Sequence, residues 1–221
     1  DDESELDDEL DLATLDLVEP GVDDIRTWTA PSDDADEDDE LEDLLDVVTE
    51  REEIAEDDRL VIQAEASGIY GHLVALDDDR FDALEDGFAA SSLNSLVEDD
   101  GEGVNLEVEA DDGTGNQEAT ALDLGDSDVE NDDIFVLVDQ AEGQMFLIVD
   151  TSSSDAFTRS LSPDVDFTAE LEYEADDDDR FEFDGSGFDG SAGGGFSGDA
   201  AFPYFQAGDE NTQTVSTAFA I

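Results

Sequence analysis

The sequence has no cysteine and no lysine, a single histidine, and no run of 18 or more apolar residues. The lack of cysteine excludes disulfides, zinc–thiolate sites and thiol nucleophiles. The lack of a long apolar run predicts that no segment of this chain spans a membrane. The chain begins at Asp1 without a methionine, so we expect a mature or trimmed product.

Negative charge dominates the composition. The 221 residues include 69 Asp and Glu against six arginines, and the formal net charge is -63. Such a surface excludes nucleic acid as a partner, because phosphate contacts need Lys and Arg. In dilute buffer this charge opposes compaction, whereas at about 1 M salt the Debye length is about 3 Å and most repulsion is screened. A hydrophobic fraction of 38% argues for a folded domain. We therefore predict a folded, salt-requiring protein of an extreme halophile.

The apolar residues predict mostly strands. Alternation or short apolar runs mark them, and turn residues such as Pro31 and Ser67-Gly68 end them. Trp28 is expected on the core side of its strand. The runs IFVLV and MFLIV predict strands buried on both faces, joined by a hairpin loop over residues 139–143. The predicted strands are residues 12–18, 24–30, 58–66, 104–109, 119–124, 134–138, 145–149, 165–173 and 214–221.

Two regions have helical spacing instead. In residues 40–50, four apolar residues form one predicted face: Leu41, Leu44, Leu45 and Val48. Residues 69–97 predict helix in two pieces interrupted at Gly87, with Phe81, Leu84 and Phe88 in one apolar stripe.

The fold class expected from this pattern is mainly β. We predict an antiparallel β-sandwich, Ig-like or jelly-roll-like, with one or two inserted helices. It forms a single domain over residues 24–221, with a Gly/Asp-rich loop at 176–200. An acidic, partly ordered segment precedes it at residues 1–23.

No sequence motif points to catalysis. Nucleophile-elbow, zinc-protease and phosphate-loop patterns are missing, and His72 has no Ser or Cys context. Among 69 carboxylates, acid pairs arise at any spacing by chance, so no glycosidase pair stands out. We expect a protein that is not an enzyme and has no cofactor, apart from Ca²⁺ or other hydrated cations.

One turn is a candidate cation site. Residues 123–133 (DLGDSDVENDD) gather oxygen side chains between two predicted strands, and hard cations prefer oxygen ligands. The alternating acids Asp34, Asp36 and Asp38 do not make an EF-hand, because position 6 is Asp39 and position 12 is Leu45. The predicted ligands are Asp126, Asp128, Asn131, Asp132 and Asp133.

Residues 57–71 (DDRLVIQAEASGIYG) resemble a segment of a domain that recurs in haloarchaeal cell-surface, S-layer-like glycoproteins, including proteins with a C-terminal PGF-type anchor. The resemblance covers roughly residues 24–221. It implies surface display and structural or adhesive work, without catalytic residues. This sequence differs from the typical member of that family, because it contains no N-glycosylation sequon. Further matching segments are residues 28–31, 81–84, 122–124, 202–205 and 211–217.

Three functions are consistent with these features. The first is a structural component of the cell surface whose partners are copies of itself or other surface proteins, in a homo-oligomer, lattice or filament. The second is a subunit of an extracellular filament or pilus that completes a neighbour's sheet by strand exchange. The third is a secreted sugar-binding module, in which aromatic side chains of residues 181–205 line a groove. A haloviral surface protein is the remaining alternative. The strand-exchange candidates are Leu12, Leu15, Leu17, Val215, Phe219 and Ile221.

Overall fold

The computed structural model describes residues 21–32, 35, 40–55, 58–77, 81–98, 104–125, 129, 132–162, 165–175 and 211–221. The predicted strand 12–18 and the loop 176–200 lie outside these residues. The strands are β1 (Gly21–Ala30), β2 (Thr49–Glu50), β3 (Arg59–Ser67), β4 (Phe88–Ala89), β5 (Val104–Ala110), β6 (Ile134–Asp139), β7 (Gln144–Asp150), β8 (Asp166–Ala175) and β9 (Asn211–Ala220). The helices are α1 (Leu41–Val47), α2 (Tyr70–Leu76), α3 (Ala83–Asp86) and α4 (Ala90–Glu98).

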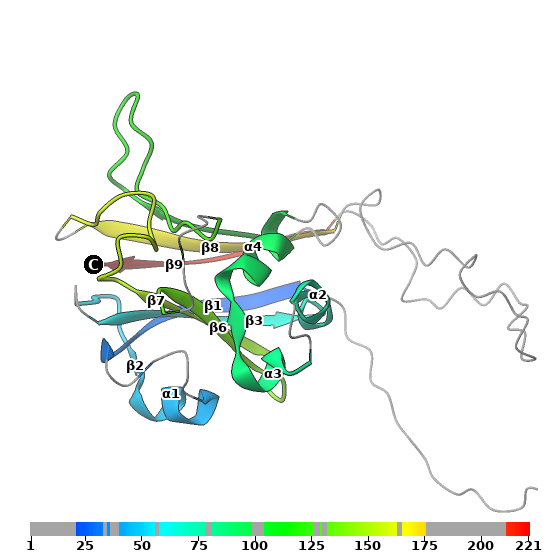
Figure 1. The fold of residues 1–221 in the computed structure, drawn as a ribbon. Helices are drawn as coiled ribbons and strands as arrows, with labels where there is room; N and C mark the ends of the chain where they lie inside the picture. Colours follow the sequence, from blue (N-terminus) through cyan, green and yellow to red (C-terminus); the bar gives the residue numbers. More distant parts are fainter. Residues whose placement is uncertain are drawn as a thin grey trace, which may run out of the picture.

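The strands form two antiparallel sheets that lie one above the other (Figure 1). The large sheet has the order β2-β1-β3-β7-β6-β4, and the small sheet has the order β5-β8-β9. Figure 1 shows α1 on the far side of the large sheet from the small sheet, and α4 beside the space between the two sheets. The mainly β, two-sheet prediction is therefore confirmed.

The central strands of the large sheet are buried on both faces, as their continuous apolar sequence predicted. Alternate residues of β6 and β7 face opposite ways. Val136 and Leu147 belong to the main core between the two sheets. Phe135 and Phe146 belong to a second, smaller cluster that α1 closes with Leu44.

The small sheet has one buried face only. Val104, Leu106 and Val108 of β5 point inward while the residues between them are exposed, which confirms the predicted alternation. On β8 and β9, Phe167 and Phe219 stack with their ring centroids 5.4 Å apart. This sheet therefore covers the main core with its inner face and meets solvent with its outer face.

Several local predictions were wrong. Leu45 is 44% exposed, because α1 turns Leu41, Leu44 and Val47 toward the sheet and leaves Leu45 on another side of the helix. Phe81 is 76% exposed rather than part of an apolar stripe. Phe88 is buried, but in strand β4, which pairs with β6.

Other boundaries also differ. Strand β1 begins at Gly21, three residues before the start of the predicted strand at residues 24–30. Trp28 is partly buried against the second cluster, whereas Ile25 faces the main core. Within residues 119–124, Ala121 and Leu122 form isolated bridges, and the predicted strand does not form. Gly87 does interrupt the helical region as expected, with a φ of 90°.

None of the helices in the described residues has the length and apolar character that a membrane crossing requires.

Candidate functional site

The turn predicted to hold a cation lies just before β6. Asp132 and Asp133 lie within the described residues, whereas Asp126, Asp128 and Asn131 lie outside them. The structure therefore leaves the five-residue site a prediction. It does show what the two described residues contact through their backbone.

A guanidinium group lies at this turn. Arg59, at the start of β3, donates from Nη1 to the carbonyl oxygen of Asp132 at 2.7 Å. The same Nη1 lies 2.9 Å from Oδ2 of Asp150, at the end of β7. The side chains of Arg59 and Asp150 are only 7% and 21% exposed. The carbonyl of Asp133 accepts the N–H of Asp150 at 2.8 Å, which ties the turn to β7. A fixed positive charge of the chain thus joins β3, β7 and the turn.

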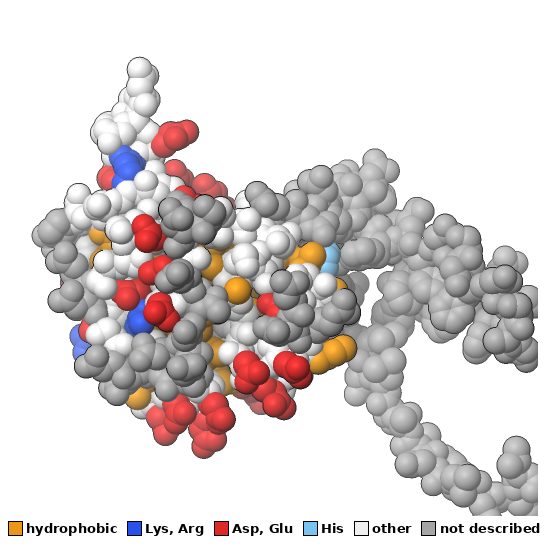
Figure 2. All heavy atoms as spheres, in the orientation of Figure 1, with side chains coloured by type: hydrophobic (Ala, Val, Ile, Leu, Met, Phe, Trp, Pro, Cys, Tyr) orange, Lys and Arg blue, Asp and Glu red, His pale blue; other side chains and the backbone are white. Residues whose placement is uncertain are grey.

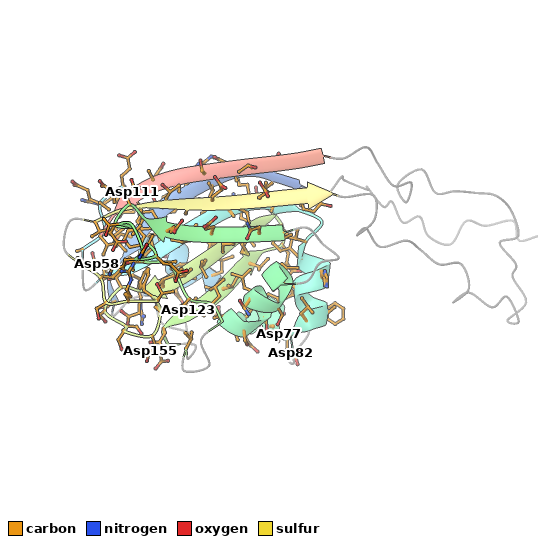
Figure 3. All side chains as sticks on the ribbon, turned by 90° about the horizontal axis from the view of Figure 1, so that it is seen from above. Asp58, Asp77, Asp82, Asp111, Asp123 and Asp155 are labelled. Carbon is orange, nitrogen blue, oxygen red and sulfur yellow. The ribbon has the colours of Figure 1, made fainter. Side chains whose placement is uncertain are left out.

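The described carboxylates form no cluster with the geometry of a metal site. No group of three or more His, Cys, Asp or Glu side chains in the described ranges is placed to hold a metal ion. Figure 3 shows Asp77 and Asp82 at the helical end of the molecule, and Asp58, Asp111 and Asp155 at the other end. These five aspartates are therefore distributed over both ends of the sandwich.

The C-terminal strand-exchange candidates are paired inside their own chain. Strand β9 pairs with β8 along its length, with Val215 opposite Leu171 and Phe219 opposite Phe167. Ile221 and Val165 exchange both backbone hydrogen bonds, at 3.1 and 3.3 Å. Donating this segment to a neighbour would require opening this ladder. The N-terminal candidates Leu12, Leu15 and Leu17 lie outside the described residues.

Acidic side chains form a row on the outer face of the small sheet. Glu107 of β5 lies directly opposite Glu170 of β8, and Glu109 lies two residues further along β5. Partial burial raises the pKa of Glu107, and the charges of Glu109 and Glu170 and a hydrogen bond with Glu109 raise it further. Like charges directly opposite each other on a sheet are destabilising. This row is therefore a site of repulsion that screening by salt relieves.

Asp112, in the loop after β5, has an environment that favours its charged form instead. The loop that follows β5 projects from the sandwich (Figure 1). At its base, Asp112 accepts hydrogen bonds from the N–H and the hydroxyl of Thr120, at 2.8 and 2.7 Å. These bonds, together with Arg159 at 3.6 Å, lower the pKa of Asp112. Arg159 also donates to the carbonyl of Glu118. The projecting loop is thus closed at its base by polar contacts.

Helix α2 carries the single histidine, and its C-cap makes a buried contact with α4. His72 lies half-buried on α2. Asp77, the C-cap of α2, accepts a 2.6 Å hydrogen bond from the hydroxyl of Ser92 on α4, and this buried bond ties the two helices together. Burial raises the pKa of the nearby Tyr70 hydroxyl above its ordinary value of 10.0, so Tyr70 is protonated at neutral pH.

Three surface hollows of the described residues are open to solvent. A depression of about 810 Å³ lies beside the projecting loop and includes Gln117, Thr158 and Arg159. Two smaller ones, of about 350 and 360 Å³, both include Arg51. Ligand pockets are more often enclosed and lined with apolar groups. The aromatic groove expected within residues 181–205 lies outside the described residues.

Comparisons with known proteins identify relatives at haloarchaeal cell surfaces. Cell surface glycoprotein 1 of Haloarcula hispanica is 33% identical over 64% of this chain and 16% of its own length. The cell surface glycoprotein of Haloferax gibbonsii is 30% identical over 77% of this chain and 17% of its own. Cell surface glycoprotein 2 of H. hispanica is 29% identical over 71% and 18%.

The chain thus spans less than a fifth of the length of these curated relatives. No family model matches it, and no solved structure matches it. The similarity agrees with the resemblance first read in residues 57–71 and supports an extracellular location. The chain therefore forms a domain similar to part of the haloarchaeal cell surface glycoproteins.

Proposed function

We propose that this chain is a structural domain of a haloarchaeal cell surface, without catalytic activity, whose partners are copies of itself or other surface proteins. The observation that carries the proposal is the similarity of 64–77% of the chain to three proteins named cell surface glycoproteins. That similarity extends over most of the domain and is not confined to one motif, so it reflects a shared fold.

The interior contacts support a structural role. The buried polar groups of the described residues join elements to one another, as Arg59 joins β3 to β7 and Ser92 joins α4 to α2. Perturbed pKa values often mark catalytic groups in a cleft. Here the raised pKa of Glu107 belongs to an open sheet face, and the lowered pKa of Asp112 belongs to a loop base.

The charge of the chain supports a requirement for salt. A formal net charge of -63 opposes the compact state unless it is screened. Acidic side chains cover α1 and α3 at the bottom of the view in Figure 2. We propose that molar salt and loosely held cations stabilise the fold, with the turn at 126–133 as one place where Ca²⁺ or another hydrated cation binds.

Cryo-electron tomography of the native envelope, with an antibody against residues 21–221, tests the structural role. We expect the label at repeated positions in the surface layer. A protein found solely in the culture medium, or an isolated chain that turns over a polysaccharide, would contradict the proposal. Strand exchange through β9 is not favoured as a second function, because β9 is fully paired with β8.

A further inference from the structure

The first and the last of the described strands, β1 and β9, lie side by side and run in the same direction. They belong to different sheets and contact each other where the sheets meet. Near their starts, the N–H of Val22 donates to Oε1 of Gln213 at 3.0 Å. Further along, Thr27 of β1 and Thr217 of β9 line the same hollow. Because the residue numbers rise together along the two strands, the strands are parallel.

The segment that follows β2 holds the end of β9. Ala220 donates its N–H to the carbonyl of Glu52 at 2.7 Å and accepts the N–H of Ile54 at 2.9 Å. On the side of β8, Ile221 exchanges backbone hydrogen bonds with Val165. Since β2 pairs with β1, this segment also ties the end of β9 to the large sheet. Strand β9 is therefore held on both edges at the point where the chain leaves it.

The start of β1 and the end of β9 lie at opposite ends of the sandwich. Gly21, the first residue of β1, pairs with Ser67, just before α2 begins at Tyr70. Figure 1 shows α2 at one end of the sandwich and the C-terminus at the other. A pull between the start of β1 and the end of β9 is thus directed along both strands.

The ladders of these two strands resist such a pull as a whole. Hydrogen bonds between antiparallel strands run perpendicular to the strands. A pull along a strand therefore loads all the bonds of its ladder together, whereas a pull across the strands breaks them one pair at a time. Strand β1 is paired with β3, and β9 with β8, from end to end. Sliding β9 would also drag Phe219, which is 3% exposed and stacks on Phe167, through the core.

We infer that this domain is a load-bearing element, in which tension between the start of β1 and the end of β9 is carried in shear. The β1–β3 ladder, the β8–β9 ladder and the seam between β1 and β9 share the load. In the curated relatives, the region similar to this chain covers 16–18% of a much longer protein. A region within a longer chain takes up tension through the strands at which the chain enters and leaves it. The inference rests on the structural role proposed above and adds the transmission of tension to it.

Single-molecule force spectroscopy of the full chain tests the inference through the direction of pull. The sequence has no cysteine, so introduced thiols place the handles without background. At about 1 M NaCl, where the Debye length is about 3 Å, handles at the two chain ends pull along β1 and β9. Handles at Asp166→Cys and after Ile221 instead pull β8 and β9 apart at one end, because Asp166 pairs with Ala220. We expect a several-fold higher unfolding force in the end-to-end geometry. Similar forces in the two geometries would overturn the inference.

A variant of the seam sharpens this test. Gln213→Ala removes the hydrogen bond to Val22, and Ser216→Ala, at an exposed position of the same strand, is the matched control. Forced unfolding reports the rate of unfolding under load. Gln213→Ala should lower the unfolding force in the end-to-end geometry and leave it unchanged with the Asp166 handle, because that pull opens β9 from its other end. Ser216→Ala should change neither force.

An equal loss of force in both geometries would show that Gln213 acts on global stability and would contradict the shared load at the seam. If Gln213→Ala does not fold, the two pulling directions on the parent chain decide the question alone. Neither result affects the tomography of the envelope, so failure of the load-bearing role is distinguishable from failure of the structural role.

Discussion

The two sheets differ in where they place the charged residues of this acidic chain. The large sheet excludes charge from the middle of its central strands, and the small sheet confines charge to one face. Strands β6 and β7 bury both of their faces, against the main core and against α1. Strand β5 alternates buried Val104 with exposed Glu107. The large sheet should therefore owe its stability to burial at any salt concentration, while the small sheet should depend on screening.

The largest effect should come from breaking the second core. Phe146→Ala removes a ring that is 2% exposed, and such a truncation costs about 3–5 kcal/mol. The loss should be similar at all salt concentrations that keep the protein folded, because it is not electrostatic. Chemical unfolding followed by circular dichroism measures it. Thr168→Ala, on the exposed face of β8, is the control and should change stability little.

The next effect concerns two arginine pairs. Removing one partner of a buried ion pair leaves the other charge unpaired, so Arg59→Gln should cost about 3–5 kcal/mol. The matched variant Arg26→Gln breaks the pair with Asp24, whose side chains are 44% and 42% exposed. Its effect should be small and should vanish in molar salt. If urea titrations gave similar losses in the free energy of unfolding for the two variants, burial would not explain the difference between the two ion pairs.

A smaller effect should appear at the base of the projecting loop. The folded pKa of Asp112 lies below its ordinary value of 3.8 because Thr120 and Arg159 favour the carboxylate. Its contribution is therefore present above the unfolded pKa and lost as pH falls through the folded pKa. Asp112→Asn should lower stability at neutral pH and flatten the acid limb below about pH 4. Thermal melts across that pH range would show an unchanged acid limb if the prediction is wrong.

The smallest effect should have the opposite sign. The folded pKa of Glu107 lies above its ordinary value of 4.5, through partial burial and the charges of Glu109 and Glu170. The folded state thus holds a proton that the unfolded state releases, and stability falls as pH rises through this range. Glu107→Gln should raise the melting temperature at neutral pH, most clearly at the lowest salt that allows folding. If the variant were less stable than the parent in that buffer, the repulsion assigned to Glu107, Glu109 and Glu170 would be contradicted.

Much of the fold could be predicted because alternation reports burial directly. The runs in residues 134–138 and 145–149 indicated burial on both faces, and Val104, Leu106 and Val108 indicated burial on one. The predictions failed where two environments compete for the same apolar residues. Leu45 has the helical spacing of a core residue, yet α1 packs on the sheet through Leu44, and Leu45 points about 100° away from it around the helix. Phe81 similarly has core spacing and lies exposed.

The candidate site was less predictable, because it depends on contacts between distant residues. The acids of residues 126–133 pointed to a cation, and nothing near them indicated that Arg59 would lie at Asp132. These residues are 73 positions apart, and the pairing of β3 with β7 and of β7 with β6 brings them together. The signal that was available was the position of an arginine at the start of a strand that is otherwise buried.

The sequence by itself determined the charge, the strand periodicity and the class of the fold, because each follows from local composition and spacing. It also carried the resemblance to haloarchaeal surface glycoproteins, which the comparisons support. The tertiary structure alone decided the strand order, the second core beneath α1, the burial of Arg59, and the pairing of β9 with β8 in its own chain. These depend on which distant segments pair, and the free energy of that pairing is shared across the whole sandwich.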